Sequence, residues 1–231
     1  VVAMLINGLG FTNRRLYLTP QFFQSKAIEF LFEEEVVSND FNDHALGKAL
    51  DEISCYGSSK LYAEVAFEIA MEQGLLGPRA HHDSTSFLLH GQYSDDNPEQ
   101  AIEVTHGYSK DHRPDLKQVM MALTMSGDAN LPIWMEPLDG NSSDKQSFHE
   151  TIKRIKSFQQ QLKLCNDFFW IADSALYVPE KLLSLPDVNW LSRVPENIKE
   201  CKKILSIPSQ DVIWTKGSNG YQWTQLGSVY S

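Results

Sequence analysis

The spacing of apolar residues changes once along this chain, close to residue 79. Before that point apolar residues recur every three or four positions, as on the buried side of a helix. This spacing predicts helices at 20–32, from about 43 onward, and from about 58 to 74. Thr19-Pro20 is a typical start for the first helix, and Asn42 or Asp43 for the second. We therefore expect a small α-helical domain over residues 1–78.

From Arg79 onward, apolar and β-branched residues come in short runs that are typical of strands. Strands are predicted at 80–90, 101–106, 118–124, 131–136, 168–172 and 188–194, with a helix near 146–163. Consecutive strands followed by alternating helix and strand indicate an α/β domain with a mixed sheet flanked by helices. We assign this core to residues 79–195.

Beyond Pro195 a helix is predicted at 198–205, followed by two short strands at 212–215 and 221–224. The glycines of 217–220 between these strands indicate a β-hairpin. Residues 196–231 therefore form a third region.

Composition places the chain among ordinary globular proteins, with 231 residues, 42% of them apolar and 22% charged. Its apolar stretches are too short to span a bilayer, and its start, Val1-Val2-Ala3-Met4, lacks the basic flank of a signal peptide. We expect a soluble intracellular protein without a membrane partner. Cys55, Cys165 and Cys201 are widely spaced, which favours free, buried thiols over disulfides or a zinc ribbon.

The net charge of −10 is unevenly distributed. Residues 1–78 have five basic against eleven acidic side chains, residues 79–186 ten against fifteen, and residues 187–231 five against four. The acidic excess argues against a nucleic-acid partner only superficially, because bound metal would neutralise some core carboxylates and basic stretches occur at 106–117 and 153–156. Charge alone neither supports nor excludes DNA.

Two aspartates are the strongest candidates for chemistry. Asp83 lies within the strand pattern 80–90, and Asp173 closes the apolar run 168–172. Carboxylates on or at the end of buried strands are costly to desolvate, and divalent metal ions commonly compensate them. We interpret the pair as half of a two-metal phosphoryl-transfer site whose third carboxylate is not evident.

Each aspartate also has a simpler explanation. Asp173 could instead cap a short helix beginning at Ser174, and Asp83 could be a solvent-facing residue of an edge strand. A zinc site at His81-His82 is disfavoured, because neighbours on a strand point to opposite faces.

The segment 106–118 is rich in hydrogen-bond donors. Ser109, Lys110 and Arg113 could hold phosphates there, although on its own the segment is better interpreted as a polar loop. A nucleotide-binding fingerprint, a Walker lysine motif, H-E-x-x-H and G-x-S-x-G are all missing from the sequence.

Four segments resemble, in order and spacing, the motifs of the DDE transposases of bacterial insertion sequences. They are His82 to Thr85, Thr105 to Gln118, Asp139 to Lys145 and Ile171 to Ala175. The helical front part, including 5–11, also resembles the amino-terminal domain of one branch of that family. The resemblance covers nearly the whole chain, so a host nuclease of the same fold is disfavoured.

The resemblance implies a ribonuclease H-like core in which Asp83 and Asp173 are catalytic metal ligands. It implies two Mg²⁺ ions, replaceable by Mn²⁺, that serve cleavage and strand transfer at the element ends. Partners would be double-stranded DNA and a second copy of the chain, in the cytoplasm at the nucleoid. The implied DNA contacts are Ser109, Lys110, His112, Arg113, Lys117 and Asn141.

The family's third carboxylate is a glutamate on a helix after the β-rich insertion, of which residues 196–231 resemble the beginning. Glu196 and Glu200 directly follow the fifth strand and lack the surrounding signature. We therefore expect the chain as given to be a fragment with little or no activity. The alternative is a non-catalytic remnant that only binds DNA or pairs with an intact copy.

Overall fold

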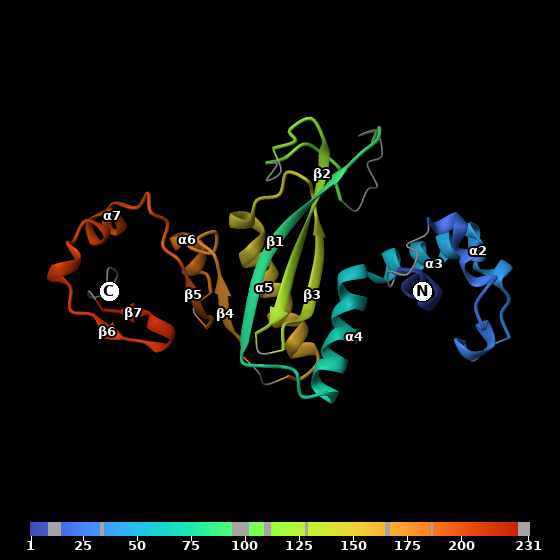
Figure 1. Cartoon of the computed structure of the whole chain (residues 1–231), viewed down its shortest axis with the longest axis horizontal. Coiled ribbons are helices and arrows are strands. Elements are labelled where there is room, and N and C mark those ends of the chain that lie inside the picture. Colours follow the sequence, from blue (N-terminus) through green and yellow to red (C-terminus); the bar gives the residue numbers. More distant parts are fainter. Residues whose placement is uncertain are drawn as a thin grey trace. The chain divides into compact units, whose positions relative to one another are not determined.

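The computed structural model describes residues 1–8, 15–32, 35–93, 102–108, 112–127, 129–164, 167–185 and 187–225. It comprises two compact units, residues 1–65 and 66–231, and helix α4 (Ser58–Glu72) contains the boundary between them. Figure 1 shows the elements of both units.

The first unit is helical. Its elements are α1 (Val2–Gly8), η1 (Leu16–Leu18), α2 (Thr19–Phe23), η2 (Ile28–Phe30), η3 (Ser38–Phe41), α3 (Asp43–Tyr56) and the first part of α4. Phe22 and Phe23 of α2 are buried with Ala3 of α1 and Ile28 of η2. The Phe23 ring also packs on Phe41, with 4.7 Å between centroids. This aromatic cluster is the core of the unit.

The prediction of one helix over 20–32 is wrong, because α2 ends at Phe23 and only the single turn η2 follows. The polar residues Gln24 to Lys26 interrupt the apolar repeat, and Ala27 leaves the helical region with φ −77° and ψ 78°. The reversal brings Phe23 and Phe32 into ring contact. Tertiary packing thus overrides the local helical pattern.

The two later helices agree with the prediction. Asn42 caps α3, since its Oδ1 accepts a hydrogen bond from the Ala45 backbone N–H at 2.9 Å. Gly74 follows α4 with φ +64°, the left-handed conformation that glycine adopts readily at helix ends.

The second unit contains a five-stranded mixed sheet (Figure 1). Its strands are β1 (Arg79–Leu89), β2 (Lys117–Ser126), β3 (Leu131–Leu138), β4 (Phe169–Ala172) and β5 (Asn189–Ser192), in the order β3-β2-β1-β4-β5. Strand β2 is antiparallel to both of its neighbours, whereas β4 and β5 run parallel to β1. Helix α5 (Asp144–Gln161) connects β3 to β4, and α6 (Pro179–Leu182) lies between β4 and β5 in the chain. The predicted α/β arrangement, a mixed sheet flanked by helices, is confirmed.

One face of the sheet is buried by helices. Ile152 and Ile155 of α5 are buried, and Phe158 of α5 contacts both Phe67 of α4 and Trp134 of β3. Trp170 of β4 is also buried here. The core of the unit lies between this face of the sheet and helices α4 and α5.

The prediction of a strand at 101–106 is wrong for its described residues, 102–106. Thr105 forms only an isolated antiparallel bridge with Gln118. The other predicted strands of the sheet, and the helix near 146–163, match β1 to β5 and α5 to within a few residues at their ends.

Residues 196–225 contain α7 (Lys199–Leu205), η4 (Ser209–Asp211), β6 (Thr215–Lys216), η5 (Ser218–Gly220) and β7 (Gln222–Trp223). Strands β6 and β7 pair antiparallel, as the hairpin prediction requires. They are shorter than predicted, and β6 overlaps the predicted strand 212–215 only at Thr215. Cys55 is exposed and Cys201 half-buried, which corrects the prediction of buried thiols, and Cys165 lies outside the described residues. Among the helices described, each is too short or too polar to cross a membrane.

Candidate metal centre and adjoining loops

Asp83 lies on the open face of the sheet. Along β1, Ala80, His82 and Ser84 are buried while His81 and Asp83 are exposed. This alternation follows from the two-residue repeat of a strand, with the buried positions facing α5. The carboxylate of Asp83 is therefore accessible rather than part of the core.

Asp173 lies level with Asp83 on the adjacent parallel strand. The pairs between β1 and β4 run from Arg79 with Phe169 to His81 with Ile171, a constant offset of 90 positions. The same offset joins Asp83 to Asp173, directly beyond the end of β4. Level residues on neighbouring strands point to the same face, so the fold places both carboxylates side by side on the open face.

The two aspartates line one pocket of about 360 Å³. Its remaining lining residues are His81, His82, Leu123, Met125, Ile171 and Ala172. Leu123 is the residue opposite Asp83 on β2, and Met125 is opposite His81. The pocket is thus lined by two acidic groups and by an apolar wall that β2 supplies.

Each carboxylate is oriented by one backbone hydrogen bond. The Ser84 N–H donates to Asp83 Oδ1 at 2.8 Å, and the Ala175 N–H donates to Asp173 Oδ1 at 2.8 Å. Among the described residues, no side chain donates a hydrogen bond to Oδ2 of either aspartate. That oxygen remains available to a ligand on both residues.

The structure also tests the simpler explanation of Asp173 as a helix cap. Residues 174–176 form a turn rather than a helix, and the next helix, α6, begins only at Pro179. The idea that Asp173 caps a helix starting at Ser174 is therefore wrong. Its Oδ1 accepts the hydrogen bond that fixes this turn, and the residue still lines the pocket.

The two neighbouring histidines have different environments. His82 is buried against the Phe148 ring of α5, and its Nδ1 lies 2.8 Å from Thr124 Oγ1. Burial lowers the pKa of His82 to about 4, so its ring is neutral near pH 7. His81 lies on the opposite face of β1 and lines the pocket. Their opposite orientations agree with the argument against a zinc site.

The pocket suits a hard cation, since Mg²⁺ and Mn²⁺ prefer carboxylate oxygens. Two oriented carboxylates, whose Oδ2 atoms accept no hydrogen bond from a side chain in the described part of the chain, fit such an ion. Within the described ranges, however, no group of three or more His, Cys, Asp or Glu side chains is arranged to hold a metal ion. The residues present thus supply part of a coordination shell.

Two of the motif segments, 105–118 and 139–145, meet where β2 begins and β3 ends. Thr105 and Gln118 exchange backbone hydrogen bonds, and the Gln118 side-chain amide donates to the Gly140 carbonyl at 2.7 Å. A Cβ on Gly107 would overlap with the Gly140 carbonyl oxygen. The two segments therefore cross in direct backbone contact, which explains why both have glycine at the crossing.

Two of the predicted DNA-contacting side chains of the segment 105–118, Arg113 and Lys117, already have partners within the protein. Arg113 forms a bidentate ion pair with Asp115, with Nε–Oδ1 and Nη2–Oδ2 distances of 2.8 and 2.6 Å. Hydrogen bonding from Arg113 lowers the pKa of Asp115 to about 2. Lys117 Nζ donates to the Tyr93 carbonyl at 2.7 Å. His112 is exposed with φ 57°.

Asn141 is exposed at the crossing of the two segments, next to Gly140. Ser109 and Lys110 lie outside the described residues. The structure thus brings Asp83 and Asp173 together in one pocket. It places Arg113 in the loop before β2, Lys117 at the first position of β2 and Asn141 in the loop after β3.

Leu123 and Met125, which form the pocket wall, were not among the site residues predicted from the sequence. Each lies on the open face of β2, where alternate residues are only half-buried. Alternation within 117–126 could have placed them on one face, but the pairing of β2 with β1 is needed to place them beside Asp83.

Three comparisons relate the chain to known proteins. A family model described as a domain of unknown function (DUF4277) matches residues 1–67, close to the limits of the first compact unit, 1–65. No curated protein matches the sequence.

Among solved structures, the chain is similar to Mos1 transposase complexes. The paired-end complex with the left transposon end has 14% identity over 83% of this chain and 57% of that chain, with a TM-score of 0.31. The Mos1 mariner paired-end complex with Mn has 10% identity over 84% and 72%, with a TM-score of 0.33. The Mos1 strand transfer complex has 14% identity over 84% and 57%, with a TM-score of 0.32. This chain thus spans 57% of the first of these.

Proposed function

We propose that the second unit is the core of a DDE-type DNA transposase of a bacterial insertion sequence. The observation that carries the proposal is that Asp83 of β1 and Asp173, directly after the adjacent parallel strand β4, line one pocket. The resemblance of the surrounding motifs to that family points in the same direction.

Asp83 and Asp173 would hold Mg²⁺, or Mn²⁺ in its place, through their Oδ2 atoms. Such ions activate the attacking oxygen and stabilise the leaving oxygen of a phosphodiester during in-line displacement. The backbone hydrogen bonds to each Oδ1 keep the two carboxylates oriented toward the pocket. The apolar wall of Leu123 and Met125 limits water on one side of the site.

The loops around 105–118 and 139–141 would contact the DNA backbone. Arg113 already presents its guanidinium in bidentate geometry to Asp115, and a phosphate accepts the same paired hydrogen bonds. Lys117 and Asn141 would add contacts, together with Ser109, Lys110 and His112. Because two element ends must be joined, the protein would act as a homodimer on double-stranded DNA in the cytoplasm, at the nucleoid.

A second function, DNA binding without cleavage, is favoured by one specific observation. Among the described residues, no third carboxylate joins Asp83 and Asp173. Two carboxylates alone hold a divalent ion less firmly than three, so efficient cleavage would need one more acidic ligand.

The proposal is tested by the Mg²⁺ dependence of DNA affinity. Fluorescence anisotropy of a labelled duplex is measured with the full chain, in Mg²⁺ and in EDTA. We expect Mg²⁺ to tighten binding, and Asp83→Asn or Asp173→Asn to remove that gain while binding in EDTA stays the same or improves. Asp211→Asn is the matched control, because Asp211 is exposed and lies outside the pocket. Equal Mg²⁺ responses in all four proteins would refute the proposal.

Nicking of supercoiled plasmid by the same proteins separates the two functions. Metal-dependent nicking that either pocket variant abolishes would establish cleavage by this chain. Metal-dependent binding without nicking would support the second function.

A further inference from the structure

The strand next to Asp173 carries an arginine at the same level. The pairs between β4 and β5 run from Phe169 with Asn189 to Ala172 with Ser192, a constant offset of 20 positions. The residues directly after β4 and β5 are Asp173 and Arg193. The two segments are still in contact there, since Ser192 Oγ donates a hydrogen bond to the Asp173 carbonyl at 2.6 Å.

Arg193 belongs to the open face of the sheet. Leu191 is opposite Ile171, and Leu191 is exposed while Ile171 lines the pocket. Two residues further on, Arg193 and Asp173 follow the same alternation. Asp83 of β1, Asp173 directly after β4 and Arg193 directly after β5 therefore occupy corresponding positions when the two registers are continued past the last paired residues, and we call these three residues the row.

The guanidinium of Arg193 is exposed and available. In the described part of the chain, Arg193 makes no ion pair or hydrogen bond through its side chain, whereas Arg113 pairs with Asp115 and Arg154 with Glu136. Arg193 does not line the pocket itself. In the strand order it lies on the side of Asp173 away from Asp83.

We infer that Arg193 is a phosphate-positioning residue of this site. A DNA phosphate entering the pocket would meet two negative carboxylates, and its outward oxygens need donors that the aspartates cannot provide. Arginine supplies two parallel N–H donors and a permanent positive charge, which suit a phosphate approached from the β5 side. This inference rests on the proposed function, because it assumes that the row binds DNA.

The test uses the anisotropy assay with the full chain in Mg²⁺ at several salt concentrations. Arg193→Ala should weaken binding about tenfold, the effect of one charge-assisted hydrogen-bonded contact, and should lower the salt slope by about one. Arg193→Lys should keep the salt slope but recover only part of the affinity, because lysine lacks the bidentate geometry.

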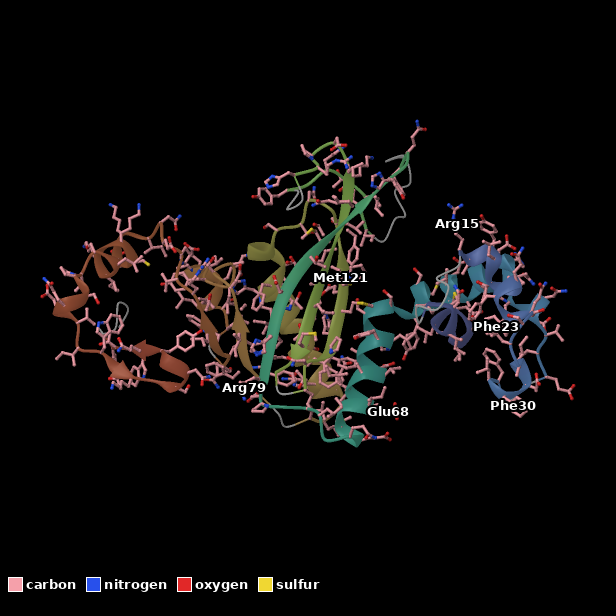
Figure 2. The ribbon with its side chains drawn as sticks, viewed as in Figure 1. Arg15, Phe23, Phe30, Glu68, Arg79 and Met121 are labelled. Carbon is pink, nitrogen blue, oxygen red and sulfur yellow. The ribbon has the colours of Figure 1, made fainter. Side chains whose placement is uncertain are left out.

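Arg79→Ala is the matched control. Arg79, which Figure 2 labels, is also on the exposed side of β1, but it is the first residue of that strand and does not line the pocket. Arg79→Ala removes the same charge from the same sheet face. Because Arg79 does not belong to the row and does not line the pocket, its substitution should change affinity much less than Arg193→Ala does. Equal effects of the two substitutions would overturn the inference. Thermal unfolding of each variant shows whether a lost affinity reflects misfolding, and Arg193→Lys supplies the answer if Arg193→Ala is unstable.

The same data distinguish the two proposals. If the pocket aspartate variants leave Mg²⁺-dependent binding unchanged, or if the chain does not bind DNA, the proposed function fails and this inference fails with it. If the aspartate variants abolish the Mg²⁺ effect while Arg193→Ala behaves like Arg79→Ala, only the role of Arg193 is overturned.

Discussion

Asp83 and Asp173 are separated by 90 positions, the offset that also relates each paired residue of β1 and β4. The two carboxylates are therefore level and on one face, although they come from strands on opposite sides of α5 in the sequence. A shift of the pairing by one residue would place Asp173 on the buried face. The site thus depends on one register between two strands.

Metal binding should depend on both carboxylates. Asp83→Asn and Asp173→Asn should each weaken Mn²⁺ binding by at least about tenfold, because each removes one of two oriented ligands. Electron paramagnetic resonance of Mn²⁺ titrated into the protein without DNA measures this directly. Asp211→Asn should bind Mn²⁺ like the parent. Loss of binding in all three variants, or in none, would contradict a site built on this pair.

Substitution of Gly140 should destabilise the second unit. A Cβ there would overlap with the Gln118 carbonyl oxygen and lie 2.6 Å from the Thr105 carbonyl oxygen. Both obstacles are backbone atoms, so Gly140→Ala should cost about 1–3 kcal/mol of the free energy of unfolding. Urea unfolding measures the change. Gly47→Ala on α3 is the control, because its Cβ meets nothing within 4 Å and alanine should stabilise that helix by up to about 1 kcal/mol.

Arg154 should matter more than its neighbour Lys153. Arg154 pairs with Glu136, which is buried and also accepts hydrogen bonds from Trp134 and Thr151. Arg154→Gln leaves that buried carboxylate without its cation and should cost about 1.5–3 kcal/mol of the free energy of unfolding.

Lys153→Gln is the comparison for that substitution. Lys153 pairs with Glu150 at 3.2 Å, but both side chains are about half exposed. Such surface pairs contribute about 0–1 kcal/mol, so this variant should unfold at nearly the parental urea concentration. Equal costs for the two substitutions would mean that Glu136 does not need Arg154.

His82 should make the protein less stable in mild acid. Its pKa is about 4 when folded, against about 6.5 when unfolded, because burial disfavours the charged ring. Between these values the unfolded chain binds a proton that the folded chain does not. The free energy of unfolding should therefore fall as the pH falls, and by about 2 kcal/mol from this residue between about pH 7.5 and about pH 5.

Chemical denaturation of His82→Gln over that pH range isolates the effect. Glutamine can still bond to Thr124 but does not titrate there, so the variant should lose about 2 kcal/mol less than the parent on acidification. His149, whose pKa is also lowered by burial and by Lys181, is present in both proteins.

The sequence predicted the sheet well because its strands have simple patterns. Alternation within β1 and β2 and the apolar run of β4 each define a strand without reference to the rest of the chain. The prediction of a single helix at 20–32 was wrong because a local pattern was not enough there. Apolar residues between Phe22 and Phe32 have helical spacing, yet the chain reverses so that both rings enter one core.

The candidate site was only partly predictable. Two aspartates at strand positions indicated a metal site, but their level placement follows from the pairing of β1 with β4, which no local pattern specifies. The Arg113–Asp115 pair depends on a loop in which His112 has a left-handed conformation, and spacing alone does not reveal it. No sequence pattern distinguishes Arg193 from other surface residues. Only the pairing of β4 with β5 places it next to Asp173.

The parallel pairing of β1 with β4 has a kinetic consequence. Contacts between residues far apart in sequence form slowly, because closing a long loop costs entropy before the contacts stabilise it. Strands β1 to β3 can pair through local antiparallel connections, whereas β4 must reach β1 after α5 has folded back. The acidic pocket should therefore appear late in folding, so that earlier intermediates with a formed antiparallel meander would not yet bind metal.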